Sequence, residues 1–450
     1  MKLKTFSMGG VHPEENKITA EVATVVAPLP QQAIFPLSQH IGAPAKPVVN
    51  RGDKVKVGTL IAEANGFVSA PIYSSVSGTV LKVDTAIDAT GYRKPAIYIN
   101  VEGDEWEESI DRSETLETLD KHPELTPEEI VNHIKVAGVT GMGGAGFPTF
   151  IKLCPPPTAK AECVILNGVE CEPYITSDYR LMMEHADEIL VGLDLLMKGA
   201  KVERGYIGIE DNKPEAIKLF EQKTANDPRI EIVALAKKYP QGGEKQLVDA
   251  VINRQVPAPP AIPVNVGAIV QNVGTAYAVY QAVMKNKPLF ERYTTVTGKQ
   301  LKNPGNFLVR MGTPMRELID LCGGMPEGDN KVLAGGPMMG KSVVSTDVTV
   351  CKGTNSITIL TDADAHRKAA QPCIRCGKCV SACPMGLEPY LLATLSSFKE
   401  WERLEAEQVT SCISCGSCQF TCPSHRPILD NILLGKGVVM GIIKSRNAKK

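Results

Sequence analysis

The feature that most constrains this chain is a cysteine pattern that occurs twice near its end. Of 13 cysteines in 450 residues, eight fall in the last fifth of the sequence. In each copy, four cysteines are separated by two, two and three residues, and a proline follows the last. The first copy is Cys373, Cys376, Cys379 and Cys383, and the second, 39 residues later, is Cys412, Cys415, Cys418 and Cys422. Such clustering in a long chain without a secretory signal indicates metal binding rather than disulfides.

This spacing is typical of ferredoxins with two [4Fe–4S] clusters, in which the fourth cysteine of each copy binds the other cluster. It predicts two ligand sets: Cys373, Cys376, Cys379 and Cys422 for cluster 1, and Cys412, Cys415, Cys418 and Cys383 for cluster 2. The alternative is zinc, but zinc ribbons use two pairs of cysteines per metal and need neither the extra cysteine nor the proline. Because each cluster carries single electrons, the rest of the chain has to provide an electron donor site.

Composition narrows the class of protein. With 43% hydrophobic and 22% charged residues, the chain is globular, and its length calls for several domains. A net charge of −1 argues against a general nucleic-acid binder. No apolar run approaches the roughly 18 residues of a membrane span, and no signal peptide begins the sequence. We therefore expect a soluble, intracellular chain whose membrane link, if any, comes through a partner.

The first 110 residues read as a β-rich domain. Short apolar stretches alternate with turn signals between residues 30 and 105, and residues 52–83 resemble a lipoyl-type barrel-sandwich. In that family a lysine at a hairpin tip carries the prosthetic group, whereas the corresponding tip here, residues 63–67, has no lysine. The module is thus expected to act as a docking or lid element. The acidic stretch that follows, residues 102–130, is interpreted as a solvated linker.

Strands and helices alternate from about residue 126 to 285, which predicts a parallel sheet with helices on both faces. Thr126, Pro127 and Glu129 form a helix start with a capping box. One long helix is predicted over residues 177–198. Residues 286–355 return to short strands and glycine turns, and the last domain, residues 362–450, has a helical stretch at 390–405 between its two cysteine groups.

A glycine-rich loop, residues 141–148, is the first candidate binding element of the predicted α/β domain. It formally fits the GxGxxG pattern, but a helix precedes it where a dinucleotide fingerprint needs a strand. Consecutive small residues instead let main-chain N–H groups wrap a phosphate or a flat ring, and Lys152 follows at a suitable distance. Polar residues 167–172 come directly after a predicted buried strand, where α/β folds bind ligands.

Four segments together resemble the FMN- and NADH-binding fold of the flavoprotein subunit of respiratory complex I: residues 141–152, 167–173, 239–244 and 271–275. The domain order is closest to the RnfC family, named after the Rnf electron-transport complex. The resemblance implies a multidomain α/β and β protein with a barrel-sandwich (1–110), an FMN/NADH-binding parallel-sheet domain (126–285), a β-grasp module of the SLBB type (286–355) and an α-helical double [4Fe–4S] domain (362–450).

The resemblance also implies ligand contacts at matching positions. Non-covalent FMN would be bound by Gly141, Gly143, Gly144, Lys152, Asn167, Glu170, Asn272 and Thr275. NAD(H), as substrate, would lie against Phe147, Glu172 and Glu244. No residue is assigned as a catalytic acid, base or nucleophile. Of the five cysteines outside the repeat, Cys154, Cys163, Cys322 and Cys351 are expected to be buried thiols, and Cys171 to lie near the flavin pocket.

The two ends of the chain then fit one function. A flavin can accept two electrons together and release them singly, which joins NAD(H) to one-electron clusters. The resemblance implies an electron-transfer subunit of a membrane-bound ferredoxin:NAD⁺ oxidoreductase coupled to Na⁺ or H⁺ translocation. Its partners would include a ferredoxin-like iron–sulfur subunit, and it would be peripheral on the cytoplasmic side of the membrane. The alternatives are a soluble flavin/iron–sulfur reductase of the cobalamin-reductase kind and a non-catalytic electron-wire protein.

Overall fold

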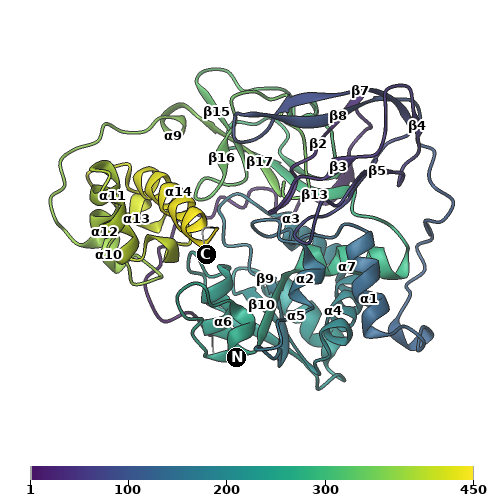
Figure 1. The fold of residues 1–450 in the computed structure, drawn as a ribbon, viewed down its shortest axis with the longest axis horizontal. Coiled ribbons are helices and arrows are strands. Elements are labelled where there is room, and N and C mark those ends of the chain that lie inside the picture. Colours follow the sequence, from purple (N-terminus) through teal and green to yellow (C-terminus); the bar gives the residue numbers. More distant parts are fainter. Residues whose placement is uncertain (1–2, 449–450) are drawn as a thin grey trace.

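A computed structural model describes residues 3–448 (Figure 1). The β-rich N-terminal region occupies the upper right of the view, above a helix-covered parallel sheet, and the helical C-terminal domain lies at the left. The barrel consists of an antiparallel sheet of order β2-β8-β7-β4 and a smaller sheet of order β3-β5-β6. Its strands are β2 (Gln32–Pro36), β3 (Lys46–Pro47), β4 (Lys54–Val55), β5 (Leu60–Glu63), β6 (Ile72–Tyr73), β7 (Gly78–Ile87) and β8 (Arg93–Val101).

The flavin-type domain is built on a parallel sheet of order β11-β10-β9-β12. The strands are β9 (Cys163–Gly168), β10 (Arg204–Glu210), β11 (Ile230–Leu235) and β12 (Ala268–Asn272). The helices are α1 (Pro127–Val136), α2 (Thr149–Lys152), α3 (Ser177–Glu184), α4 (Ala186–Ala200), α5 (Pro214–Thr224), α6 (Glu244–Ile252) and α7 (Val273–Met284), with short turns η1 (Leu119–Lys121) and η2 (Pro263–Val266). The capping box predicted at Thr126 and Glu129 is present.

Alternate residues of β9 face two different cores, which is why both faces of this sheet are covered. Val164 and Leu166 pack into the large core with α1, α4 and α7. Cys163 and Ile165 pack with α6. The predicted parallel sheet with helices on both faces is confirmed, and the carboxyl ends of β9 and β12 lie side by side at one edge, with Asn167 opposite Asn272.

The third region is a six-stranded sheet of order β1-β14-β13-β17-β15-β16. Its elements are β1 (Thr24–Val26), β13 (Glu291–Thr297), β14 (Gly305–Arg310), α8 (Met315–Leu321), β15 (Asn330–Ala334), β16 (Lys341–Ser342) and β17 (Ser356–Thr361). The edge strand β1 comes from the N-terminal segment, which first runs along the flavin-type domain, where Lys4 bridges to Leu235 and Val11 to Tyr239. Residues 3–26 therefore lie outside the barrel to which the sequence assigned them.

The C-terminal domain repeats its structure with its sequence. It contains α9 (Asp362–Ala365), α10 (Lys378–Ser381), α11 (Pro389–Ser397), α12 (Trp401–Ala406), η3 (Val409–Ser411), α13 (Ser417–Phe420) and α14 (Ile428–Asn447). Helices α10 and α13 begin 39 residues apart, as do α11 and α14. Leu392, Leu404 and Ile432 are among the residues that form its core. Within residues 3–448, no helix is both long and apolar enough to cross a bilayer.

Three expectations about local structure were wrong. The helix predicted over 177–198 breaks at His185, whose backbone is not helical (φ −135°, ψ 40°) and whose ring bonds Glu188 and the Tyr293 hydroxyl. The helix predicted over 390–405 breaks between α11 and α12. The acidic stretch is not a free linker, because Asp104 pairs with Arg310 and Asp111 with Lys285. In each case tertiary partners override the local pattern.

The barrel lies directly on the glycine loop. The Ile41 N–H donates to the Gly146 carbonyl oxygen at 3.2 Å, and the exposed ring of Phe67, from the hairpin tip, meets Phe150 edge-on. Gly146 has φ +69°, and a Cβ atom there would lie 3.3 Å from the His40 Cα. A glycine at this position is required by both the backbone conformation and the approach of the barrel.

We expect Gly146→Ala to lower the free energy of unfolding by about 1–2 kcal/mol, the cost of placing a side chain in the left-handed region, and to loosen the barrel. Gly353→Ala is the matched control, because its Cβ atom would meet nothing within 4 Å. Denaturant unfolding and limited proteolysis of the barrel linker measure both effects. Equal stability of the two variants would contradict this account of Gly146.

Candidate cofactor sites

The glycine loop is a closed, solvent-facing turn between α1 and α2. The Gly141 N–H donates to the Phe147 carbonyl oxygen at 2.8 Å, which joins the two ends of the loop. Gly143 and Gly144 at its tip are exposed. A Cβ atom on Gly144 would meet no protein atom within 4 Å. The tip therefore leaves its main chain accessible to a ligand.

This loop lies against the N-terminus of α7. Asn272 caps the helix by accepting the Gly274 N–H, and the Thr275 hydroxyl accepts the Met142 N–H at 3.0 Å. A Cβ atom on Gly143 would come within 2.8 Å of Asn272 Nδ2. Three of the predicted FMN residues, Gly143, Asn272 and Thr275, are thus brought together at the start of a twelve-residue helix.

Two side chains on neighbouring strand ends complete this edge. Asn167 Nδ2 donates to the Gly242 carbonyl oxygen at 2.8 Å, and Asn272 Nδ2 donates to Asp178 at 2.7 Å. The Glu170 carboxylate accepts N–H groups at the start of α3 and so serves that helix. Lys152 bonds Glu244 Oε1 at 2.6 Å and the Val270 carbonyl oxygen at 3.1 Å.

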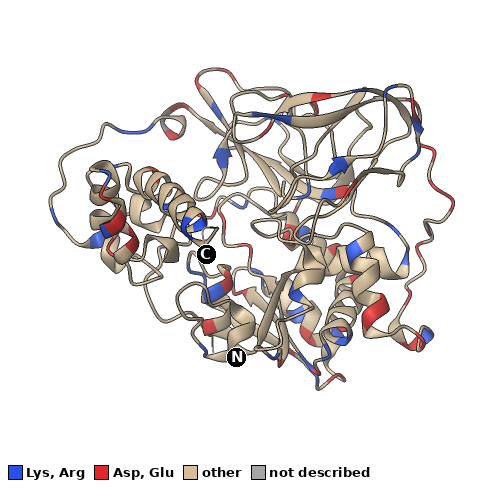
Figure 2. Ribbon diagram, viewed as in Figure 1, with Lys and Arg blue, Asp and Glu red and all other residues tan. Residues whose placement is uncertain are grey.

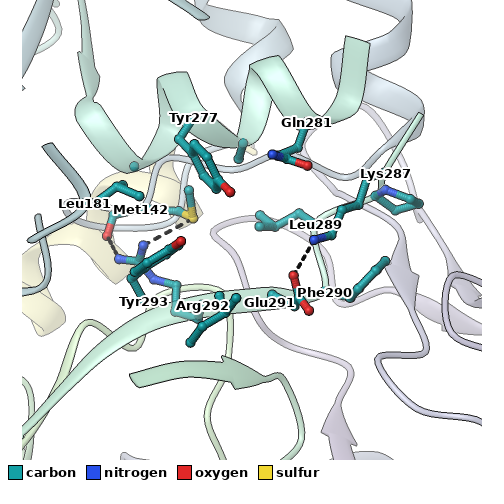
Figure 3. A pocket seen from close by; sticks show the side chains of 14 residues that line it. Met142, Leu181, Tyr277, Gln281, Lys287, Leu289, Phe290, Glu291, Arg292 and Tyr293 are labelled. Carbon is teal, nitrogen blue, oxygen red and sulfur yellow. Dashed lines mark hydrogen bonds and ion pairs between the residues drawn. The ribbon is translucent and has the colours of Figure 1, made fainter. Parts of the chain in front are cut away.

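Buried charges hold the loop from behind (Figure 3). Arg292, on β13, donates to the Met142 carbonyl oxygen at 2.8 Å and contacts the Met142 sulfur. Burial raises the pKa of Asp178 to about 6, and the neighbouring Glu170 carboxylate adds to the rise. Sequence reasoning missed Met142, Asp178 and Arg292, because nothing in the local sequence places them under the loop.

These residues fit FMN. A helix N-terminus beside a glycine loop offers main-chain N–H groups to a phosphate, and Lys152 adds a cation nearby. The open space over Gly144 leaves room for a ligand where a larger side chain would intrude. Sequence reasoning selected these positions, and the structure brings Gly141, Gly143 and Gly144 to one edge of the sheet with Asn167, Asn272 and Thr275.

The residues predicted for the NADH side do not all lie together. Glu244 is the first residue of α6 and pairs with Lys152, and Phe147 is half-buried at the end of the glycine loop. Glu172 Oε1 instead accepts the N–H groups of Met338 and Met339, at 2.6 and 3.0 Å. Burial raises the pKa of this carboxyl group. Glu172 thus binds the loop between β15 and β16.

The cluster 2 cysteines lie together and are largely buried. Cys383, Cys415 and Cys418 are 7–8% exposed. Burial raises the pKa of the Cys418 thiol, and the nearby thiols of Cys415, Cys412 and Cys383 act in the same direction. The structure therefore places Cys383, from the first copy of the motif, among the three cysteines of the second copy.

The cluster 1 cysteines face the surface. Cys373 and Cys376 are exposed, and Cys379 and Cys422 are half-buried. Burial raises the pKa of Cys379, and the neighbouring Cys422 contributes to the rise. Within residues 3–448, no three Cys, His, Asp or Glu side chains are arranged to hold a single metal ion.

The two cysteine loops share one backbone. Arg375 and Ser414, at equivalent positions, are left-handed (φ 52° and 62°), as are Gly377 and Gly416 (φ 73° and 79°). These turns bend each loop around its cysteines. Because each set consists of thiols alone, the donor chemistry fits iron–sulfur clusters.

The cluster 2 loop is packed on the flavin-type domain. The Tyr239 hydroxyl donates to the Cys415 carbonyl oxygen at 2.8 Å. The Cys171 sulfur accepts the Gly242 N–H at 3.4 Å and packs in the same apolar group as Tyr239 and Cys415. Since Gly242 also binds Asn167, a continuous set of contacts joins the strand edge to the cluster 2 cysteines. Of the remaining cysteines, Cys163 and Cys322 are buried, Cys351 is half-buried, and the expectation for Cys154 was wrong because it is exposed.

Comparison with known families agrees with this arrangement. Residues 4–104 match the RnfC barrel sandwich hybrid domain, 134–281 the Nuo51 FMN-binding domain, 293–342 the SLBB domain and 372–426 the 4Fe-4S dicluster domain. A chain of an NAD⁺-reducing [NiFe]-hydrogenase in the H2-reduced state superposes with a TM-score of 0.48 and 18% identity, over 69% of this chain and 60% of that one.

Two relatives match over nearly the whole length. The RnfC-type subunit of the Na(+)-translocating ferredoxin:NAD(+) oxidoreductase complex of Acetobacterium woodii is 43% identical over 97% of each chain. The corresponding subunit of the proton-translocating ferredoxin:NAD(+) oxidoreductase complex of Clostridium ljungdahlii is 44% identical over 90% of this chain and 87% of its own.

Fold and site together define an electron-transfer protein with an FMN-binding domain and a 4Fe-4S dicluster domain. More particularly, the chain belongs to the RnfC family of ion-translocating ferredoxin:NAD⁺ oxidoreductases, the Rnf complexes. It is an electron-transfer subunit of a multi-subunit assembly, as the resemblance implied.

We expect Gly144→Val to weaken FMN binding at least tenfold without changing thermal stability or iron content, because the side chain would enter space that the protein leaves open. Titration of flavin-free protein with FMN, followed by quenching of flavin fluorescence, measures this. Gly437→Val, on an exposed position of α14 that also leaves open space, is the control. FMN affinity equal to that of the control would contradict the assignment.

Proposed function

We propose that this chain exchanges electrons between NAD(H) and a one-electron partner, using non-covalent FMN and two [4Fe–4S] clusters. When bound, FMN converts between two-electron and one-electron transfer, which the clusters alone cannot do. The observation that carries the proposal is the packing of one cysteine set onto the flavin-type domain through Tyr239. The names of the two relatives support NAD⁺ and ferredoxin as the redox couples.

The chain's own residues have distinct tasks in this proposal. Gly141, Gly143 and Gly144 present main-chain groups to FMN, with Lys152, Thr275 and the Asn272-capped helix start around its phosphate. Asn167 and Glu170 hold the strand edge below the flavin. Phe147 and Glu244 lie beside the glycine loop and would contact NAD(H). For Glu172, bonded to Met338 and Met339, a role on the NAD(H) side would be exerted through that loop.

The burial of the two cysteine sets suggests their order. Cys383, Cys412, Cys415 and Cys418 lie on the flavin side, whereas Cys373 and Cys376 face solvent. We infer that the buried set exchanges electrons with the flavin-type domain and that the exposed set exchanges them with the partner. In the assembly, the chain would lie peripherally on the cytoplasmic side of the membrane, next to a ferredoxin-like subunit, and ion translocation would belong to other subunits.

Single-cysteine variants test both the function and the order. With Cys422→Ser, which removes a ligand of cluster 1, NADH should still reduce the remaining cluster. With Cys383→Ser, which removes a ligand of cluster 2, reduction of the remaining cluster by NADH should fall at least tenfold, because the flavin-side set is lost.

The measurement is anaerobic stopped-flow bleaching of iron–sulfur absorbance, with iron content showing that one cluster remains and dithionite showing that it is reducible. The reverse pattern would overturn the order. If the fully loaded wild-type chain shows no bleaching by NADH when supplied with FMN, the proposed function itself is wrong and the chain is an electron wire or scaffold.

A further inference from the structure

We propose that the surface around the cluster 1 cysteines binds an acidic one-electron carrier protein, and that Arg375 and Lys378 are its main contacts. This proposal rests on the proposed function, because it assumes that electrons leave or enter through the exposed cysteine set. It goes further in naming the surface, the residues and the charge of the partner. We call residues 366–378 together with Tyr390 the basic face.

The two copies of the cysteine motif differ where their surroundings differ. Arg375 and Lys378 of the first copy correspond to Ser414 and Ser417 of the second, 39 residues later. The second copy is packed against the flavin-type domain, with Ser417 fully buried and Gly416 within contact of the Met338 carbonyl oxygen. The same backbone turn thus carries small neutral residues where it contacts this chain.

The first copy carries two cations on the same turn and faces solvent. Residues 366–378 are all exposed and contain Arg367, Lys368, Arg375 and Lys378 but no acidic residue, in a chain whose net charge is −1. Figure 2 shows basic residues along the chain leading from α9 to α10. Clustered charge of one sign around a redox centre attracts a partner of the opposite sign.

Neighbouring acids do not neutralise these two cations. Arg367 pairs with Asp430, whereas neither Arg375 nor Lys378 forms an ion pair within the described residues. On the adjacent helix α12, Glu405 pairs with Arg446, and Glu400 at its start pairs with Arg403. Arg375 and Lys378 are therefore available to carboxylates from outside the chain.

An apolar contact lies within the basic face. Ile374, between two cluster 1 cysteines, is 67% exposed, whereas its counterpart Ile413 is half-buried in the apolar group around Tyr239. Tyr390 is 40% exposed and lies near Cys379 and Arg375. A small apolar centre with a charged rim suits the small, short-lived interfaces of electron-transfer partners. A lipid surface would match the charge but could not take up an electron, so we favour a protein.

The test uses the full chain loaded with FMN and both clusters, under anaerobic conditions. Arg375→Glu/Lys378→Glu is compared with wild type and with Lys218→Glu, an exposed residue of α5 on the far side of the flavin-type domain (Figure 1). Two rates are measured: bleaching of the chain's own clusters by NADH, and NADH-dependent reduction of a purified acidic [4Fe–4S] ferredoxin. The single variant Lys378→Glu is the second choice if iron content falls in the double variant.

At low ionic strength we expect the double variant to reduce ferredoxin at least tenfold more slowly, with unchanged bleaching by NADH, while Lys218→Glu matches wild type. Added salt should slow the wild type and remove most of the difference, because screening weakens attraction between surface charges. With cytochrome c, a basic one-electron acceptor, the variant should be the faster one.

Unchanged ferredoxin reduction with normal bleaching would overturn the docking surface and leave the proposed function intact. Absence of bleaching in the wild type would overturn both. A variant that loses binding to vesicles of anionic lipid, but reduces ferredoxin normally, would show that the basic face binds a membrane surface instead.

Discussion

The contact between the cluster 2 cysteine loop and the flavin-type domain is the interaction on which the rest of the structure depends. Electron exchange between two cofactor domains requires that they be held at a fixed, short separation. Here a buried tyrosine hydroxyl binds the carbonyl oxygen of a cluster ligand, and Gln246 adds a bond to the Pro384 carbonyl oxygen. Gly9 of the N-terminal segment also lies so close to Cys383 that a Cβ atom would come within 2.5 Å of its carbonyl group. Three separate parts of the chain thus fix the position of one loop.

The accessory modules act as supports for the cofactor loops. Lys352 is fully buried, and its ammonium group donates to the Pro71 and Gly138 carbonyl oxygens, which joins the β-grasp region, the barrel and the end of α1. Burial lowers the pKa of this lysine to about 7. The β-grasp region also supplies Arg292 behind the glycine loop and the loop that Glu172 binds. Barrel and β-grasp modules therefore explain why a glycine-rich loop with little internal structure keeps one conformation.

The two cysteine motifs show how a duplicated unit can serve two environments. Their backbones agree down to the left-handed residues, since both must bend around the same kind of ligand set. Their outward side chains differ, because one copy packs against Tyr239 and Met338 and the other meets solvent. The duplication thereby gives the chain one internal and one external end for electron exchange.

The sequence by itself determined the domain order, the cysteine sets, the glycine loop and the parallel sheet, because spacing, capping and turn chemistry are local properties. It also selected Gly143, Asn272 and Thr275 individually, although Gly143 lies far from the other two along the chain. Only the tertiary structure decided which cysteine set is buried, that Glu172 holds Met338 and Met339, that the predicted helix breaks at His185, and that residues 3–26 leave the barrel. These features depend on contacts between segments distant in sequence, and no local pattern encodes such contacts.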